Sequence, residues 1–385
     1  MPGFANAHSH LFHRALRGRT HDEGGDFWRW REEMYAVAGM LDPERYRALA
    51  IAVFSEMLAA GYTAVGEFHY VHHRPDGSPY ADHAMELALA DAAEETGIRL
   101  TLLDTCYLTG GIGQPLNPEQ LRFGDGTADA WLERWYSLRE ALAGRVTLGA
   151  AIHSVRAVPE EAIATIVAGL PPETPLHVHL SEQPLENADS VRAYGVTPTA
   201  LLNRLGALSE RLTAVHATHL DDADVRLLGD ARVSIALCPT TEADLGDGIG
   251  PARALASAGA RPCIGSDQNA VIDPLLELRG LEAGERLASG RRGVFTPAEL
   301  WTAGSTNGYR SLGLGRAGFA IGDWCDLVEL DAASARTVGS RDGQLVLTAT
   351  AADVLTTVVG GRVVRNPDNA ARLAAALQNL EAETR

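Results

Sequence analysis

The sequence predicts an α/β fold, a (β/α)8 barrel of the TIM type that carries a small β-sandwich-like appendage. Short apolar runs typical of strands alternate with helical segments about eight times, starting at residue 4. A length of 385 residues suits one such barrel with additions. A doubly wound sheet would also alternate, but it would place a glycine-rich phosphate loop after its first strand, and none is found there.

The strands are expected where apolar and β-branched residues gather in short runs. In chain order these runs cover residues 4–10, 63–70, 99–107, 146–153, 175–182, 212–220, 233–238 and 262–267. Proline in the first turn and a capping residue before it mark the start of a helix at Asp42-Pro43, which ends before Gly61. The other helices of the barrel are expected at 84–95, 128–143, after 159, from 197, at 223–228 and at 251–258.

Beyond residue 267 the pattern changes twice. A capping box at 296–299 opens another helix, and short strands follow at 326–330, 354–359 and 362–364, the last two joined by a Gly360-Gly361 turn. An alanine- and leucine-rich helix is expected from Asn369. The predicted organisation is a (β/α)8 barrel at 1–318, a β appendage at 319–366 and a C-terminal helix at 367–385.

Composition narrows the class of partner. The formal net charge of −17 argues against nucleic acid and anionic membranes, so we expect a small-molecule substrate. An anionic substrate would then need a local cluster of arginines. No run of about 18 apolar residues and no signal peptide is found, and the four cysteines form no paired motif, which together favour a reducing cytoplasm.

Histidine and acidic residues gather at the ends of the predicted strands. His8 and His10 are two residues apart, so they share one face of a strand and can clamp a divalent metal such as zinc or iron. On their own they could equally be loop histidines without a ligand. Because strand ends meet at one face of a barrel, His179 and Asp267 complete a candidate metal site. His177 competes with His179, and we prefer His179 because it precedes Glu182 by three residues.

These residues, in this order, resemble the mononuclear deaminase branch of the amidohydrolase superfamily, over nearly the whole chain. Longer stretches resemble the formimidoylglutamate deiminase family within it, at 27–35, 67–73, 153–156 and 238–248. The resemblance implies hydrolysis of the formimino C=N bond of N-formimidoyl-L-glutamate, a dicarboxylate, with release of ammonia. It also implies one Zn²⁺ per chain, for which Fe²⁺ could substitute, and a homodimer.

The resemblance assigns roles to named residues. The metal would be held by His8, His10, His179 and Asp267. Catalysis would depend on Glu182 as proton carrier, on His216 beside the tetrahedral intermediate and on Asp267 as acceptor of a proton from water. The residues expected to contact the substrate are Arg31, Tyr70, His153, Arg156 and His13, with Arg156 as the main carboxylate anchor.

Two departures from the family pattern have consequences. Gln268-Asn269 follows the metal aspartate where the family typically has serine and histidine, which removes any contact made by that imidazole. The family also has several strands before the first histidine pair, so an N-terminal part of the appendage is expected to be missing, which would leave a sheet edge unpaired.

Two other functions stay open. One is a related deaminase acting on a nucleobase or nucleoside, although the arginines would then be unexplained and no aromatic pair for base stacking is evident. The other is a metal-binding barrel that has lost catalysis, against which the presence of Glu182 argues.

Overall fold

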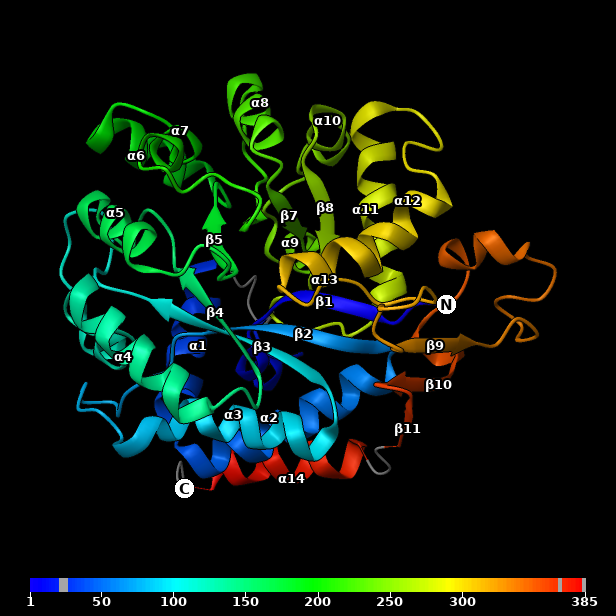
Figure 1. Ribbon diagram of the computed structural model, residues 1–385, viewed down its shortest axis with the longest axis horizontal. Coiled ribbons are helices and arrows are strands. Elements are labelled where there is room, and N and C mark those ends of the chain that lie inside the picture. The colour runs from blue at the N-terminus through cyan, green and yellow to red at the C-terminus, as the bar shows by residue number, and fades with distance from the viewer. Residues whose placement is uncertain (21–26, 366–368, 383–385) are drawn as a thin grey trace.

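The computed structural model describes residues 1–20, 27–365 and 369–382. Its eight-stranded parallel sheet keeps the strands in chain order around the centre of the molecule (Figure 1). The strands are β1 (Phe4–Ser9), β2 (Tyr62–His69), β3 (Arg99–Cys106), β4 (Thr147–Ile152), β5 (Leu176–Leu180), β6 (Leu212–His216), β7 (Ser234–Leu237) and β8 (Arg261–Ile264). A bridge between Ser9 and Asp267 brings the two end strands together. The predicted (β/α)8 barrel is therefore confirmed.

Helices surround the sheet (Figure 1). They are α1 (Phe27–Met40), α2 (Pro43–Ala59), α3 (Ala84–Thr96), α4 (Ala128–Leu142), α5 (Glu160–Gly169), α6 (Pro184–Tyr194), α7 (Pro198–Arg204), α8 (Asp222–Asp230), α9 (Pro239–Leu245), α10 (Ala252–Ala258), α11 (Pro274–Ser289), α12 (Pro297–Thr302) and α13 (Gly308–Ser311). The cap predicted for α2 is present, because the Asp42 carboxylate accepts a hydrogen bond from the Arg45 amide at 2.9 Å. Among the helices that the sequence patterns did not indicate, α6 and α9 directly follow the ends of β5 and β7.

The appendage is a three-stranded antiparallel sheet in the order β11 (Arg362–Val364), β10 (Val354–Val359), β9 (Leu327–Leu330). The expected unpaired edge is covered in part by the start of the chain. The Met1 ammonium donates to the Val328 carbonyl and the Val328 amide donates to the Met1 carbonyl, both at 2.9 Å. Figure 1 shows the N-terminus at this end of β9.

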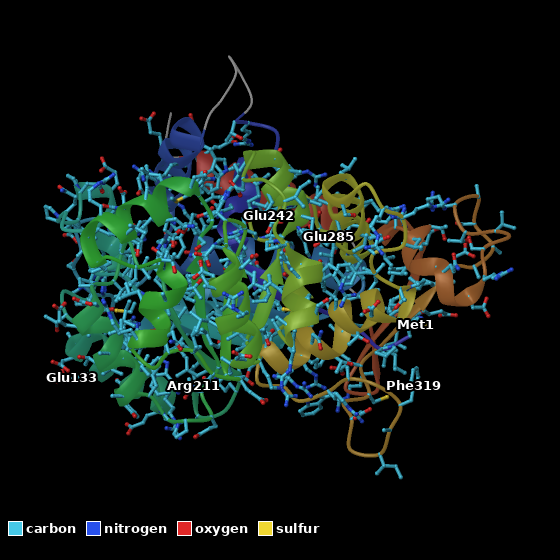
Figure 2. The ribbon with its side chains drawn as sticks, turned by 90° about the horizontal axis from the view of Figure 1, so that it is seen from above. Met1, Glu133, Arg211, Glu242, Glu285 and Phe319 are labelled. Atoms are coloured by element: carbon cyan, nitrogen blue, oxygen red, sulfur yellow. The ribbon has the colours of Figure 1, made fainter. Side chains whose placement is uncertain are left out.

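The predicted C-terminal helix is α14 (Asn369–Glu381), which runs beside α2 (Figure 1). Residues 367, 368 and 383–385 of that prediction lie outside the described part of the chain. The loop that carries Phe319 projects away from the body of the molecule, with 74% of that side chain exposed (Figure 2). Within the described residues, no helix combines the length and apolar character needed to cross a bilayer.

Candidate metal centre

Four side chains from β1, β5 and the end of β8 point at a common centre. The His179 Nε2 atom lies 3.2 Å from His10 Nε2 and 3.3 Å from His8 Nε2. Asp267 Oδ1 lies 3.4 Å from His8 Nε2 and 3.6 Å from His10 Nε2. Ligands held 2.0–2.2 Å from a tetrahedral ion are about 3.3–3.6 Å from one another. The sequence-predicted set therefore has the spacing that a zinc-sized ion requires.

Hydrogen bonds orient two of these imidazoles. His10 Nδ1 lies 3.0 Å from the Phe68 carbonyl and His179 Nδ1 lies 2.9 Å from the His153 carbonyl, so each Nδ1 carries the proton and each Nε2 presents its lone pair. Burial lowers the pKa of His10 to about 3 and lowers those of His8 and His179 well below the usual value. The three imidazoles are therefore neutral, as metal ligands must be.

The choice between the two histidines of β5 is decided by their partners. His177 Nε2 lies 3.0 Å from the Ser311 carbonyl, one layer deeper in the barrel than His179. Burial lowers its pKa to about 4, so it is a neutral core histidine that donates to a backbone carbonyl. His179 is the member of the pair that joins His8, His10 and Asp267.

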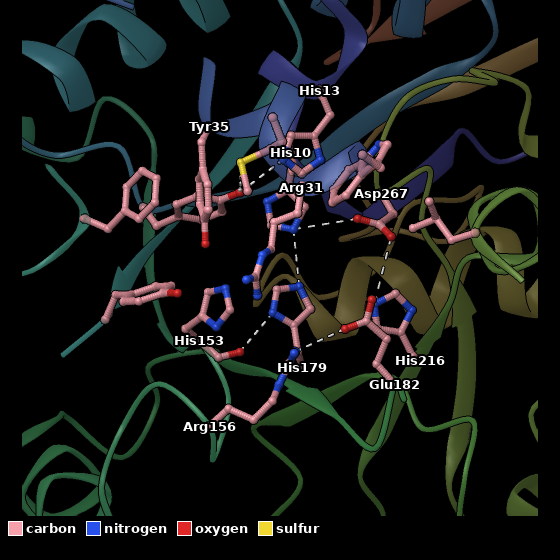
Figure 3. Close-up of a pocket in the computed structure, with 16 residues that line it drawn as sticks. His10, His13, Arg31, Tyr35, His153, Arg156, His179, Glu182, His216 and Asp267 are labelled. Carbon is pink, nitrogen blue, oxygen red and sulfur yellow. Dashed lines mark hydrogen bonds and ion pairs between the residues drawn. The ribbon is translucent and has the colours of Figure 1, made fainter. Parts of the chain in front are cut away.

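His216 lies at the edge of the metal ligands, surrounded by carboxylates. Its Nε2 is 3.9 Å from both Glu182 Oε1 and Asp267 Oδ2 (Figure 3). Its Nδ1 is 3.5 Å from Glu242 Oε1. Burial alone would lower its pKa, but Glu182, Glu242 and Asp267 outweigh burial and raise the pKa to about 10. His216 can therefore present a positively charged donor beside the reacting atoms.

Arg156 is paired with two glutamates. Its Nη2 donates to Glu182 Oε2 at 3.2 Å, and its Nε lies 3.5 Å from Glu186 Oε2. The guanidinium still lines the cavity, with the side chain 27% exposed (Figure 3). The structure thus joins the expected carboxylate anchor to the expected proton carrier, a link that the sequence did not suggest. Glu186 was missed because it lies in the first turn of α6, the helix that no pattern indicated.

The expected substrate contacts form the wall of one small cavity of about 90 Å³. Tyr70 bonds through its hydroxyl to His13 Nε2 at 3.1 Å, and the His153 ring lies 4.4 Å from the Tyr107 ring. The side of α1 that faces inward contributes a four-residue strip to this wall, as a lid would. The lining residues are His10, His13, Trp30, Arg31, Met34, Tyr35, Tyr70, Tyr107, Phe123, His153, Arg156, His179, Glu182, His216, Leu245 and Asp267.

Aromatic rings are more prominent in this wall than the sequence indicated. Tyr70 and Tyr107 both pack against Phe123, with ring centroids 5.0 and 5.5 Å apart and interplanar angles of 88° and 55°. The sequence analysis expected no aromatic pair for base stacking and did not single out these rings. The three rings pack against one another and do not form two parallel faces separated by the thickness of a base.

Two further polar residues near Glu182 were not singled out from the sequence. Asp247 is buried and its Oδ1 accepts a hydrogen bond from Gln183 Nε2. Burial, with help from Glu182, raises the pKa of Asp247 to about 8. The available signal was indirect, because Asp247 lies inside the 238–248 stretch that carries the family resemblance. Gln268 and Asn269 are buried and do not line the cavity.

Comparison with known proteins finds a family and individual relatives that match most of this chain. The model of the amidohydrolase family matches residues 1–364. The formimidoylglutamate deiminase of Pseudomonas aeruginosa is 40% identical over 344 residues, which are 86% of this chain and 76% of that protein. A 5-methylthioadenosine/S-adenosylhomocysteine deaminase of Natronomonas pharaonis is 28% identical, over 100% of this chain and 85% of that protein.

Solved structures of similar proteins superimpose on nearly the whole chain. An amidohydrolase from Brucella melitensis superimposes with a TM-score of 0.90 and 32% identity, covering 98% of this chain and 89% of that one. An adenosine deaminase from Xanthomonas campestris, whose structure has bound zinc, gives a TM-score of 0.84 and 25% identity, covering 99% and 85%. Both structures share the fold of this chain, and the Xanthomonas one contains zinc.

Proposed function

We propose that this chain, which belongs to the amidohydrolase family, hydrolyses N-formimidoyl-L-glutamate to N-formyl-L-glutamate and ammonia. The chain is a hydrolase that acts on a C=N bond. The observation that carries the finer proposal is the content of one cavity: a metal-ligand set, a carboxylate beside it and two arginines in the wall. In the proposed role the enzyme serves histidine degradation.

Zinc is the proposed metal because three neutral imidazoles and one carboxylate are ligands that it favours. When bound, it would lower the pKa of a water molecule from 15.7 to about 7, which makes hydroxide available at neutral pH. His8, His10, His179 and Asp267 would hold it. The spacing of their ligand atoms, 3.2–3.6 Å, supports this assignment.

The reaction adds water across the C=N bond, and the chain's own groups move the protons. Asp267 accepts a proton from the attacking water, and the oxygen of that water bonds to the formimino carbon. Glu182 delivers protons to the substrate's terminal nitrogen, which departs as ammonia when the C–N bond breaks. His216 donates a hydrogen bond to the negative charge that develops at the tetrahedral carbon's oxygen.

Recognition of a dicarboxylate would explain why two arginines, Arg31 and Arg156, line the cavity. Arg31 reaches the cavity from α1 and Arg156 from the end of β4, so they approach the substrate from different elements. A guanidinium binds a carboxylate with two parallel hydrogen bonds, which fixes the orientation of the substrate. The link from Arg156 to Glu182 joins substrate binding to the proton carrier.

A second candidate is deamination of a nucleoside, favoured by the aromatic wall and by the 28% identical relative. The test is ammonia release from the purified protein, with its metal content measured in parallel. The substrates are N-formimidoyl-L-glutamate, N-formimidoylglycine, adenosine and 5-methylthioadenosine. The glycine compound is the matched control because it lacks the side-chain carboxylate. We expect turnover of the glutamate compound and much weaker turnover of the glycine one; activity on the nucleosides alone would refute the proposal.

A further inference from the structure

The seam between β8 and β1 contains a chain of buried side-chain hydrogen bonds. Asn6, in β1, donates from Nδ2 to Ser266 Oγ at 2.6 Å and accepts at Oδ1 from the Ser266 amide at 2.9 Å. The Ser266 hydroxyl then donates to Asn269 Oδ1 at 2.6 Å. All three side chains are fully buried. The Ser266 amide can only donate, which fixes the orientation of the Asn6 side chain. The series of hydrogen bonds ends at the Asn269 side-chain amide, which faces β1.

The Asn269 amide reaches the backbone that carries the metal ligands. Its Nδ2 lies 3.1 Å from the His10 carbonyl, 3.0 Å from the Asp267 carbonyl and 3.1 Å from Ser9 Oγ. His10 and Asp267 are two of the four ligands, and Ser9 lies between the two ligands of β1. One amide group thus spans the two strand ends that supply three of the four ligands.

We propose that Asn269, held by Ser266 and Asn6, is a positioning residue that sets the distance between Asp267 and the histidines of β1. The inference rests on the metal binding of the proposed function. Asn269 stands where the family resemblance would place a histidine. It acts through the ligands and touches neither the cavity nor the substrate.

The backbone at the seam shows why such a device is needed. The Ser266 and Asp267 amides both donate to one acceptor, the His8 carbonyl, at 3.1 and 3.0 Å, and the His10 amide donates to the Asp267 carbonyl at 2.9 Å. Asp267 has φ 44° and Asn269 has φ 55°, both left-handed. Aspartate and asparagine adopt this conformation more readily than other residues that carry a side chain, and here the hydrogen bonds at the seam hold it.

Glycine 265 shows how close the strands approach. A Cβ atom at Gly265 would lie 2.8 Å from the His8 carbonyl oxygen and 2.9 Å from Cys238 Sγ. The ladder between β8 and β1 is short, so side-chain hydrogen bonds add to the few backbone bonds that fix its register. Groups that orient metal ligands typically change metal affinity about 10–100-fold when they are removed.

The experiment compares metal affinity in Asn269→Leu, Ser266→Ala and Thr63→Val by competition with a chromogenic chelator. Leucine keeps the volume of asparagine and removes its hydrogen bonds. Thr63→Val is the matched control, because Thr63 Oγ1 donates to the Phe4 carbonyl at 3.0 Å, at the other end of β1. We expect affinity to fall about 10–100-fold in Asn269→Leu and less in Ser266→Ala, and to stay within about twofold in the control.

The visible spectrum of the Co²⁺-loaded protein gives a second readout, because it reports ligand geometry and is independent of turnover. We expect Asn269→Leu to shift this spectrum and Thr63→Val to leave it unchanged. If the unaltered protein binds metal and Asn269→Leu binds it equally well with the same spectrum, the positioning role is refuted. If the unaltered protein binds no metal, the metal assignment fails and this inference fails with it. Should Asn269→Leu not fold, Ser266→Ala decides by the same two measurements.

Discussion

Arg134 is expected to be the most costly single arginine to remove, and its network allows the cost to be worked out. The guanidinium makes five hydrogen bonds to Asp104, Asp125 and Glu86, at 2.7–3.2 Å. Glu86 also lies 2.8 Å from His72 Nδ1. These residues, called here the α4 ion network, tie α3 and α4 to the loop after β2 that carries Tyr70 into the cavity.

The magnitude follows from burial. The side chains of Asp104, Glu86 and Asp125 are 0%, 2% and 6% exposed, and that of Arg134 is 14% exposed. Removing one partner of a buried ion pair costs about 3–5 kcal/mol, because the remaining charges are left unpaired. With a urea m-value of about 3 kcal/mol/M, Arg134→Met should lower the unfolding midpoint by about 1–1.7 M.

The matched control is Arg145→Met. Arg145 also bonds two carboxylates, at 2.6 Å to Asp91 and 2.9 Å to Glu94, but its partners are 46% and 48% exposed. Exposed pairs contribute about 1 kcal/mol or less, so the control should shift the midpoint by about 0.3 M or less. Both variants are followed by circular dichroism in urea, with metal content matched beforehand.

The loss of folding stability in Arg134→Met should also depend on pH. Burial raises the pKa of Asp125, but Arg134 and His73 outweigh burial and hold that pKa well below its usual range. Without Arg134, burial dominates and the pKa of a network carboxyl rises above its unfolded value. The folded variant then takes up a proton as pH falls, so its deficit is largest near pH 8 and shrinks toward pH 5. A deficit no larger than that of Arg145→Met, or one independent of pH, would refute the argument.

Three further outcomes are expected at the site. Glu182→Gln keeps its metal but loses at least about 10²-fold in kcat, because the amide carries no proton to the leaving nitrogen; normal turnover at normal metal content would remove that role. Arg156→Ala raises KM and lowers kcat, since a poorly held substrate also reacts slowly, whereas unchanged kinetics in an ammonia assay would reject the anchor. Removing the metal with a chelator lowers the thermal midpoint, and Zn²⁺ at about 1,000 times its Kd restores about 4 kcal/mol of stability; equal midpoints with and without Zn²⁺ would contradict this.

The alternation of strands and helices could be predicted because each strand is buried on both faces and is therefore mostly apolar. The same reasoning placed His8 and His10 on one face of β1, since side chains alternate along a strand. It also placed Asp267 near them, because the carboxyl ends of parallel strands meet. The helices α6 and α9 escaped detection because each begins at a proline without a capping side chain before it, so neither has an N-cap signal in the sequence.

The sequence by itself determined which chemical groups gather at the strand ends, because that depends only on strand order and on local side-chain alternation. The tertiary structure decided which of them bind one another. It separated His179 from His177 by their hydrogen-bond partners, joined Arg156 to Glu182 and Glu186, and turned Asn269 toward the backbone of β1. Those pairings depend on distances of a few ångströms between residues far apart in the chain, and local patterns contain no such information.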